Sequence, residues 1–161
     1  MWHSQQRVEH VVAAIDLPLV DEHTVSIAAG ADVVWSALFE TLDRTFSRPL
    51  ATAYARLVGC AHVEASGSRP LAPGATIAGF IVTQADVGRQ LALEGRHRFA
   101  AYALTFRLEP TGTSATRLRA ETRARFPGLA GRTYRLLVIG TGGHGVAVRR
   151  LLAGVRRAAS A

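Results

Sequence analysis

FAAYALTFRLEPTGTSATRLRAETRARF, residues 99–126, is the stretch of the sequence that decides the fold. Along residues 117–126 small or apolar side chains occupy every second position, and arginine, glutamate or another polar residue fills most of the others. Such a period of two is typical of β-strands, because successive side chains point to opposite faces of a sheet. The turn sequence PTGTS separates two such runs. We therefore predict antiparallel strands over residues 99–109 and 115–126, with one face covered and the other in water.

Upstream, the period of two begins at about residue 61, and helical spacing precedes it. Strands are predicted over residues 76–84 and 89–94, after a loop rich in glycine and proline. Before that loop, a short strand over residues 23–28 leads into two helices. The first helix has Asp32 as its predicted N-cap, and the second runs from Pro49 to Gly59.

Downstream, Pro127 and Gly128 end the sheet, and a long helix is predicted from Leu129 onwards. At about 100° per residue, one face of this helix is apolar and the opposite arc is rich in arginine. An amphipathic helix must cover an apolar surface, and the sheet offers the only large one. The apolar face comprises Leu137, Val148, Leu151 and Val155, and the arginine arc comprises Arg132, Arg135, Arg149, Arg150, Arg156 and Arg157.

The order of elements resembles that of the helix-grip superfamily, the START-like or SRPBCC proteins, which includes START domains, plant pathogenesis-related allergens and polyketide cyclase-like proteins. The resemblance also rests on VSIAAGADVVW at residues 25–35 and LEGRHRFAAYALTF at residues 93–106. It implies an α+β fold, in which a curved antiparallel β-sheet wraps around a long C-terminal α-helix, with two short helices between strands 1 and 2. It further implies a single helix-grip domain over residues 20–158. The weak apolar spacing before Pro18 indicates that residues 1–19 are an N-terminal lead-in.

Composition limits the class of protein. The chain has 161 residues, of which 48% are hydrophobic, enough for one domain with a substantial core. No apolar run approaches the roughly 18 residues of a membrane-spanning helix, and no signal peptide is recognised, so we expect a cytoplasmic protein. The lone cysteine, Cys60, excludes an internal disulfide, and no spacing of histidine, cysteine or carboxylates indicates a metal site or a cofactor.

Charge is distributed unevenly along the chain. All 19 basic residues are arginine, the net charge is +7, and residues 87–161 hold fourteen arginines and only three acids. Two interpretations stay open, an anionic partner or a solvated helix face. The lack of a nucleic-acid-binding motif argues against nucleic acid.

Residues 140–145, GTGGHG, match the G-x-G-x-x-G pattern of a dinucleotide-binding turn. That turn needs an acidic residue about 20 positions later to hold the ribose, whereas only sixteen residues follow Gly145 and none is acidic. We therefore expect these glycines to lie in the terminal helix and to kink it, or to allow a close neighbour. Angular position predicts that Gly142→Ala is neutral or stabilising and that Gly140→Ala or Gly145→Ala is harmful.

The resemblance implies a cavity between sheet and helix that binds a hydrophobic small molecule or lipid, and small side chains on the inner face of the last strand favour such a cavity. His144 points toward the apolar side of the terminal helix, whereas His97 is expected in an exposed turn. Replacing Ala120 by phenylalanine should abolish ligand binding if Ala120 borders the cavity. The predicted ligand-binding residues are Trp35, Phe39, Phe80, Tyr102, Phe106, Ala120, Thr122, Tyr134 and His144.

Three functions from different classes follow. The first is a carrier or sensor of a hydrophobic small molecule, favoured because no catalytic arrangement is visible. The second is a cyclase- or hydratase-like enzyme acting in the same cavity, with His144 and Tyr102 as the first suspects. The third is an interaction module that uses the basic terminal helix on an anionic partner. Association as a homodimer is compatible with each of them.

Overall fold

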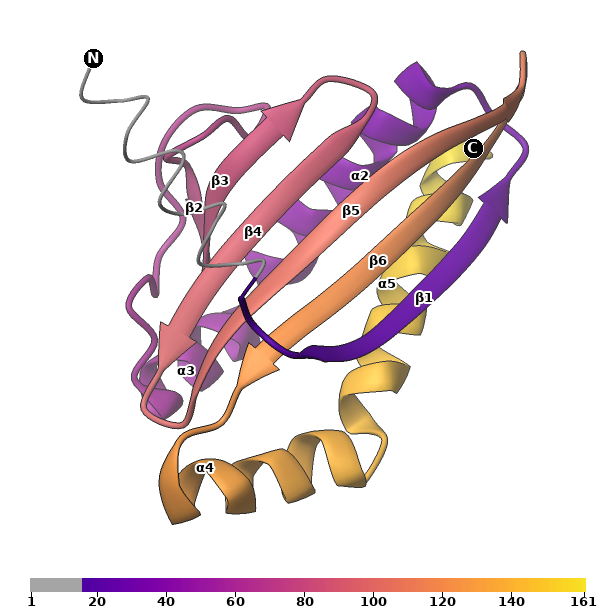
Figure 1. Cartoon of the computed structure of the whole chain (residues 1–161). Coiled ribbons are helices and arrows are strands. Elements are labelled where there is room, and N and C mark those ends of the chain that lie inside the picture. Colours follow the sequence, from indigo (N-terminus) through magenta and orange to yellow (C-terminus); the bar gives the residue numbers. More distant parts are fainter. Residues whose placement is uncertain (1–15) are drawn as a thin grey trace.

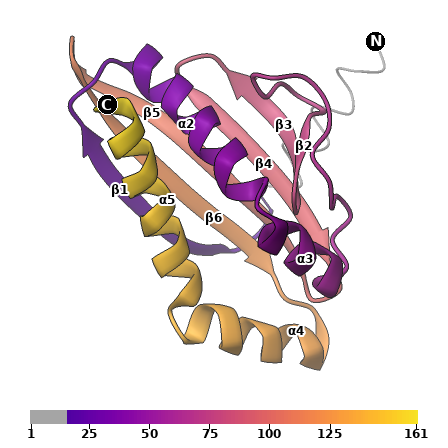
Figure 2. The same ribbon diagram turned by 180° about the vertical axis from the view of Figure 1, so that it is seen from behind.

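The computed structural model describes residues 16–161 and shows helices packed on one face of an antiparallel sheet (Figures 1 and 2). In the described part of the chain the sheet has six strands in the order β1-β6-β5-β4-β3-β2. The elements are β1 (Leu19–Ile27), α2 (Ala31–Phe46), α3 (Pro49–Val58), β2 (Thr76–Ile77), β3 (Phe80–Asp86), β4 (Gln90–His97), β5 (Ala100–Gly112), β6 (Ala115–Arg125), α4 (Gly128–Arg135), the π-helical turn η1 (Leu136–Gly140) and α5 (Gly143–Ala159).

The core lies between the sheet and the helices α2 and α5, which cross the same face (Figure 2). This arrangement confirms the predicted α+β helix-grip fold. The alternation predicted for β5 and β6 is also confirmed, because Phe106 and Ala120 are register partners and both are fully buried. Burial of these apolar side chains is the main favourable contribution to folding. The largest fully buried side chains include Leu38 and Leu42 of α2, Leu91, Leu93, Phe106 and Leu118 of the sheet, and Val155 of α5.

Several element boundaries differ from the sequence-based expectation: β1 begins at Leu19 instead of residue 23, and β4 extends to His97 instead of residue 94. The strand predicted over residues 76–84 is divided into β2 and β3, because Gly79 between them has φ +89°, which side chains other than glycine rarely adopt. The N-cap of α2 is Gly30 rather than Asp32. Asp32 lies in the first turn of α2, where its carboxylate faces the positive end of the helix dipole.

The long C-terminal helix is interrupted. It comprises α4, η1 and α5, and the chain bends before α5 at Gly142, whose φ is +76°. The predicted kink is thus confirmed, and α4 runs across the end of the sheet at an angle to α5 (Figure 1). Val148, Leu151 and Val155 are buried as predicted, whereas Leu137 is 65% exposed because it precedes the bend.

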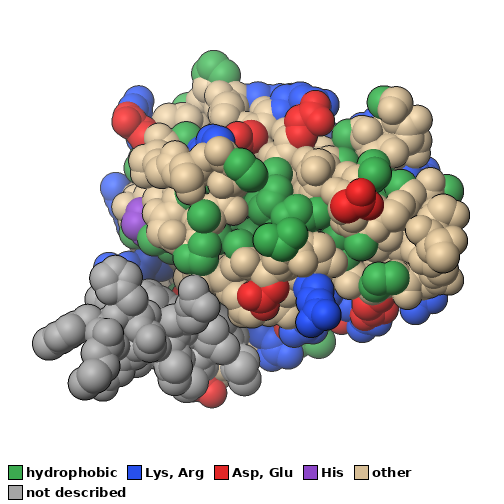
Figure 3. Space-filling view, turned by 90° about the horizontal axis from the view of Figure 1, so that it is seen from above, with side chains coloured by type: hydrophobic (Ala, Val, Ile, Leu, Met, Phe, Trp, Pro, Cys, Tyr) green, Lys and Arg blue, Asp and Glu red, His purple; other side chains and the backbone are tan. Residues whose placement is uncertain are grey.

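The dinucleotide-binding alternative is excluded at GTGGHG, because the residues before it form the π-helical turn η1, which ends at Gly140, instead of a strand. The predicted lead-in over residues 1–19 falls mostly outside the described residues. Within residues 16–161 no helix has the length and apolar character needed to cross a membrane. Figure 3 shows one end of the molecule, where basic and acidic side chains are interspersed around a central group of hydrophobic ones.

Candidate ligand-binding cavity

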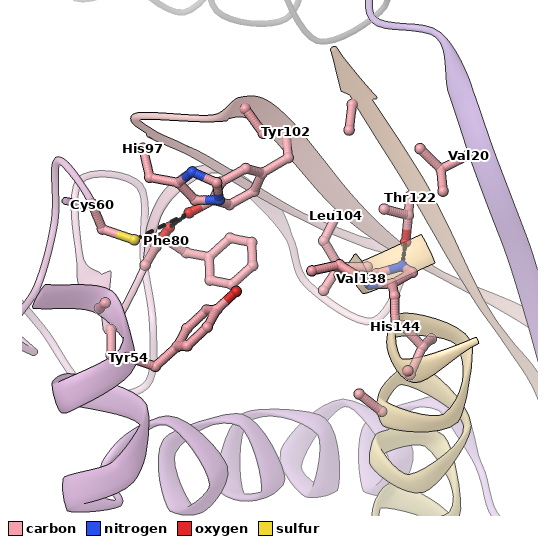
Figure 4. Close-up of a pocket in the computed structure, with 18 of the residues that line it drawn as sticks. Val20, Tyr54, Cys60, Phe80, His97, Tyr102, Leu104, Thr122, Val138 and His144 are labelled. Carbon is pink, nitrogen blue, oxygen red and sulfur yellow. Dashed lines mark hydrogen bonds between the residues drawn. The ribbon is translucent and has the colours of Figure 1, made fainter. Parts of the chain in front are cut away.

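A cavity of about 440 Å³ lies between the sheet, α3 and the bent segment from α4 to α5. Its wall is mostly apolar, and its volume falls in the range typical of small-molecule sites. Small residues such as Ala100, Ala124, Gly143 and Ala147 line it. Figure 4 shows aromatic side chains with Cys60 on one side of the open space, and Thr122, Val138 and His144 on the other.

One side of the cavity is an aromatic wall made of Phe46, Phe80, Tyr102, His97 and Tyr134. The ring centroids of Phe46 and Phe80 are 5.4 Å apart, and those of Phe80 and Tyr102 are 5.2 Å apart, both edge-to-face. His97 continues the series, with centroids 5.4 Å from Tyr102 and 4.8 Å from Tyr134. Edge-to-face packing suits the ring quadrupoles and fixes the positions of these rings.

The two polar groups at the back of the aromatic wall are neutral at physiological pH. The Tyr102 hydroxyl donates a hydrogen bond to the Gly79 carbonyl oxygen at 2.7 Å and lies 3.6 Å from Cys60 Sγ. Burial raises the pKa of Tyr102 well above its ordinary value. Burial also raises the pKa of Cys60, although its hydrogen bond with Tyr102 acts in the opposite direction. Neither side chain therefore brings a negative charge to the cavity.

Tyr54 of α3 and Tyr134 of α4 join the two helices through a hydrogen bond between their hydroxyl groups. Both tyrosines line the cavity, although Tyr54 is also 48% exposed. Burial, followed by the hydrogen bond with Tyr54, raises the pKa of Tyr134. The pair therefore connects residues 80 positions apart at the border of the cavity.

His97 corrects the expectation of a solvent-exposed turn. It is the last residue of β4, is partly buried, and lines the cavity. Its Nδ1 accepts a hydrogen bond from the backbone N–H of Phe99 at 3.1 Å, which requires the neutral ring. Burial lowers the pKa of His97, so the ring stays neutral at pH 7.

The opposite side of the cavity carries His144, near the start of α5. Its Nε2 lies 3.1 Å from Thr122 Oγ1 and 3.4 Å from Asp21 Oδ1. The other oxygen of the same carboxylate, Oδ2, lies 3.3 Å from His23 Nε2. Asp21 and Thr122 are register partners on β1 and β6, so their side chains are neighbours beneath the helix. A register shift between Leu19 and Asp21 marks the irregularity of β1 at this point.

The predicted ligand-binding residues divide into two groups. Five of them line the cavity, whereas four are buried in the core and do not line it, because α2 packs closely over that part of the sheet. Their role in binding remains a prediction. The lining group is Phe80, Tyr102, Thr122, Tyr134 and His144, and the core group is Trp35, Phe39, Phe106 and Ala120.

Sequence reasoning missed several residues of the wall. Tyr54 and Cys60 were not singled out, because their positions on and after α3 depend on how that helix meets the sheet. The spacing of Ala51, Tyr54 and Ala55 on one side of α3 was the available signal, since all three line the cavity.

Comparisons with solved structures agree with this architecture. The START superfamily protein from Mycobacterium smegmatis has a TM-score of 0.54 at 14% identity, covering 88% of this chain and 97% of that chain. Truncated norcoclaurine synthase from Thalictrum flavum has a TM-score of 0.53 at 14% identity, covering 90% and 94%. CalU16 from Micromonospora echinospora has a TM-score of 0.52 at 17% identity, covering 86% and 80%.

These likenesses establish a START-like helix-grip fold, and at such identities they establish the fold alone. No protein-family model and no curated protein sequence matches the chain.

Proposed function

We propose that this protein binds a hydrophobic small molecule in the cavity between the sheet and the bent C-terminal helical segment. The observation that carries the proposal is the cavity itself, about 440 Å³ of mostly apolar space beside the buried hydrophobic core. Interiors are normally packed almost without voids, so a space of this size indicates a site for a guest. The few polar groups in its wall would orient the guest.

A substitution that fills the cavity tests this proposal. Ala124 of β6 is buried and lines the cavity, so Ala124→Phe would place a ring in the space proposed for the guest. We expect this variant to bind the fluorescent apolar probe N-phenyl-1-naphthylamine at least about tenfold more weakly than the unsubstituted protein. Ala53→Phe, the same change at an exposed position on α3, serves as the matched control and should bind normally.

Fluorescence titration of the two variants, with a thermal melt of each, decides between binding in the cavity and binding elsewhere. Loss of probe binding in a folded Ala124→Phe variant supports the proposal. Equal affinity of Ala124→Phe and Ala53→Phe would place the probe on the surface and contradict it.

Ala120→Phe makes a useful contrast on the same strand. Ala120 is fully buried in the core and does not line the cavity, which changes the outcome expected from the sequence. A phenylalanine there has no space to fill, so we expect destabilisation by about 1–3 kcal/mol in urea unfolding. A melting temperature equal to that of Ala124→Phe would show that the two positions do not differ in packing.

The enzymatic alternative rests on the titratable side chains that the wall brings together. Of the two residues suspected from the sequence, Tyr102 donates a hydrogen bond from its hydroxyl to the Gly79 carbonyl oxygen, and burial raises its pKa so that it stays neutral. His144 is therefore the stronger candidate for acid–base chemistry. Mass spectrometry of a bound molecule recovered after incubation would distinguish a carrier from an enzyme, since a carrier leaves the mass of the molecule unchanged and an enzyme converts it to a product.

A further inference from the structure

His144 and His23 share one carboxylate at the edge of the cavity. Asp21 Oδ1 is shielded from solvent and receives no well-formed hydrogen bond within the described chain, and His144 Nε2 lies 3.4 Å from it. Asp21 Oδ2 lies 3.3 Å from His23 Nε2. A buried carboxylate oxygen without a donor is costly, so the nitrogen that faces it should carry a proton.

This requirement fixes the tautomer of His144. With the proton on Nε2, facing Asp21 and Thr122, the neutral ring keeps its lone pair on Nδ1. Among the described residues nothing makes a hydrogen bond or ion pair with Nδ1. The ring itself lines the cavity (Figure 4). On this tautomer the nitrogen without a partner in the described chain, Nδ1, is a proton acceptor.

The titratable and charged groups near His144 come from two elements. From β1, Asp21 contacts the ring, and His23 contacts the same carboxylate. From α5, Arg149 lies beside the neighbouring Gly145, where a methyl group would lie 3.5 Å from Arg149 Nη1 and 3.6 Å from His23 Nε2. On β6, Thr122 is uncharged, and its neighbours Glu121 and Arg123 form an ion pair with each other. From η1, Val138 and Ile139 are apolar. Asp21 is thus the negative group in direct contact with the ring.

We propose that the His144 side of the cavity is a proton-accepting subsite for an acidic hydroxyl group, such as a phenol or an enol, on the hydrophobic guest. This inference rests on the proposed binding function and specifies the guest. The guest's apolar body would pack against the aromatic wall, and its hydroxyl would donate to His144 Nδ1. Asp21 acts as a positioning residue, because it holds the ring and stabilises the positive charge that the ring gains.

The proton transfer balances within the complex. The O–H bond of the guest breaks, the N–H bond forms at Nδ1, and the electron pair stays on the guest's oxygen. The products are an oxyanion and an imidazolium that is flanked by the Asp21 carboxylate. No further reactant is needed.

Two probes that differ by one methyl group test the subsite. The compound 4-nitrophenol can donate its hydroxyl proton, and its anion is yellow. Its methyl ether, 4-nitroanisole, has no hydroxyl proton to donate. We expect the protein to prefer the phenol by about tenfold, the effect of a hydrogen bond with charged character. The yellow absorbance of the bound phenol should persist to about one pH unit below that of the free phenol.

His144→Gln and Asp21→Asn separate the subsite from the cavity. In both variants we expect the preference for 4-nitrophenol and the persistence of its colour to be lost, while 4-nitroanisole still binds. Asp21→Asn keeps the His144 ring, so loss of the colour there shows that the carboxylate charge matters. Persistence of the colour in both variants, or equal affinity of the unsubstituted protein for the two probes, would overturn the subsite. Failure of both probes to bind would instead overturn the binding function and the subsite with it.

Discussion

Gly95 shows how a single residue sets the position of the aromatic wall. A methyl group at this position would lie 2.6 Å from Tyr102 Cζ and would also collide with the Gly79 carbonyl oxygen. The Tyr102 hydroxyl donates to that same carbonyl at 2.7 Å. The lack of a side chain at Gly95 therefore lets the ring of Tyr102 cross β4 closely enough to reach its acceptor.

At the same scale, His97 makes folding sensitive to acid. Burial lowers the pKa of His97 in the folded protein below the ordinary 6.5, so the unfolded chain binds the proton more readily. The neutral His97 ring therefore makes its full contribution to the free energy of unfolding above about pH 6.5, and this contribution is lost as pH falls through the pKa of the folded protein. Protonation would also break the hydrogen bond from the Phe99 N–H to Nδ1.

We predict that His97→Gln loses less stability than the unsubstituted protein between pH 7.5 and pH 5.5, values chosen to lie about one unit on each side of 6.5. The free energies of unfolding in urea should therefore converge as pH falls. The partial exposure of His97 makes the effect small. Curves that stay parallel across this interval would show that His97 does not titrate with folding.

At the scale of elements, the bend before α5 gives the glycines separate roles. Gly142 has φ +76°, and the other two glycines singled out in the motif, Gly140 and Gly145, have negative φ. A methyl group at Gly140 would lie 3.8 Å from Leu136 Cδ2, an ordinary contact. The sequence-based expectation placed these glycines by counting about 100° per residue along one continuous helix. That count does not hold across the bend before α5.

The expected effect of alanine at these positions is therefore reversed from the sequence-based one. Gly142→Ala forces a left-handed backbone on an L-residue and should destabilise the protein by about 1–2 kcal/mol. Gly140→Ala and Gly145→Ala should be neutral or stabilising by up to about 1 kcal/mol, because alanine restricts the unfolded chain. Thermal melts of the three variants measure the order, and a Gly142→Ala variant as stable as Gly140→Ala would contradict the bend.

Elements with regular patterns were predictable, and their interruptions were not. The alternation in residues 117–126 was sufficient for β6, and Pro49 and Gly59 marked α3 almost to the residue. The sequence showed that the glycines would weaken the last helix. Which glycine would take the left-handed conformation depends on how α5 packs on the sheet, and no local pattern records that.

At the scale of the whole molecule, the cavity is a product of distant contacts. Asp21 meets His144 across 123 positions, and Tyr54 meets Tyr134 across 80. Phe106 and Ala120 have the same alternation as Tyr102 and Thr122, yet α2 covers the first pair and leaves the second at the cavity. Periodicity could therefore identify the inner face of the sheet, and only helix placement could divide that face into core and cavity.

Cys60 makes the occupancy of this cavity measurable. It is the only cysteine in the sequence, and it lines the cavity beside Tyr102. Since burial raises the pKa of Cys60 in the folded protein, little of the reactive thiolate exists at pH 7. We expect slow labelling by a neutral maleimide at that pH and a rate that rises as pH approaches and passes the ordinary thiol value.

A guest in the cavity should protect that thiol. We predict that saturating N-phenyl-1-naphthylamine slows the labelling of Cys60 several-fold at fixed pH, because the probe occupies the space through which the maleimide must pass. The Ala124→Phe variant is the control: since its ring replaces the probe, its rate should not respond to added probe. Mass spectrometry of intact protein over time gives both rates. An unsubstituted protein that labels equally fast with and without bound probe would place the guest away from Cys60, outside the cavity that this fold encloses.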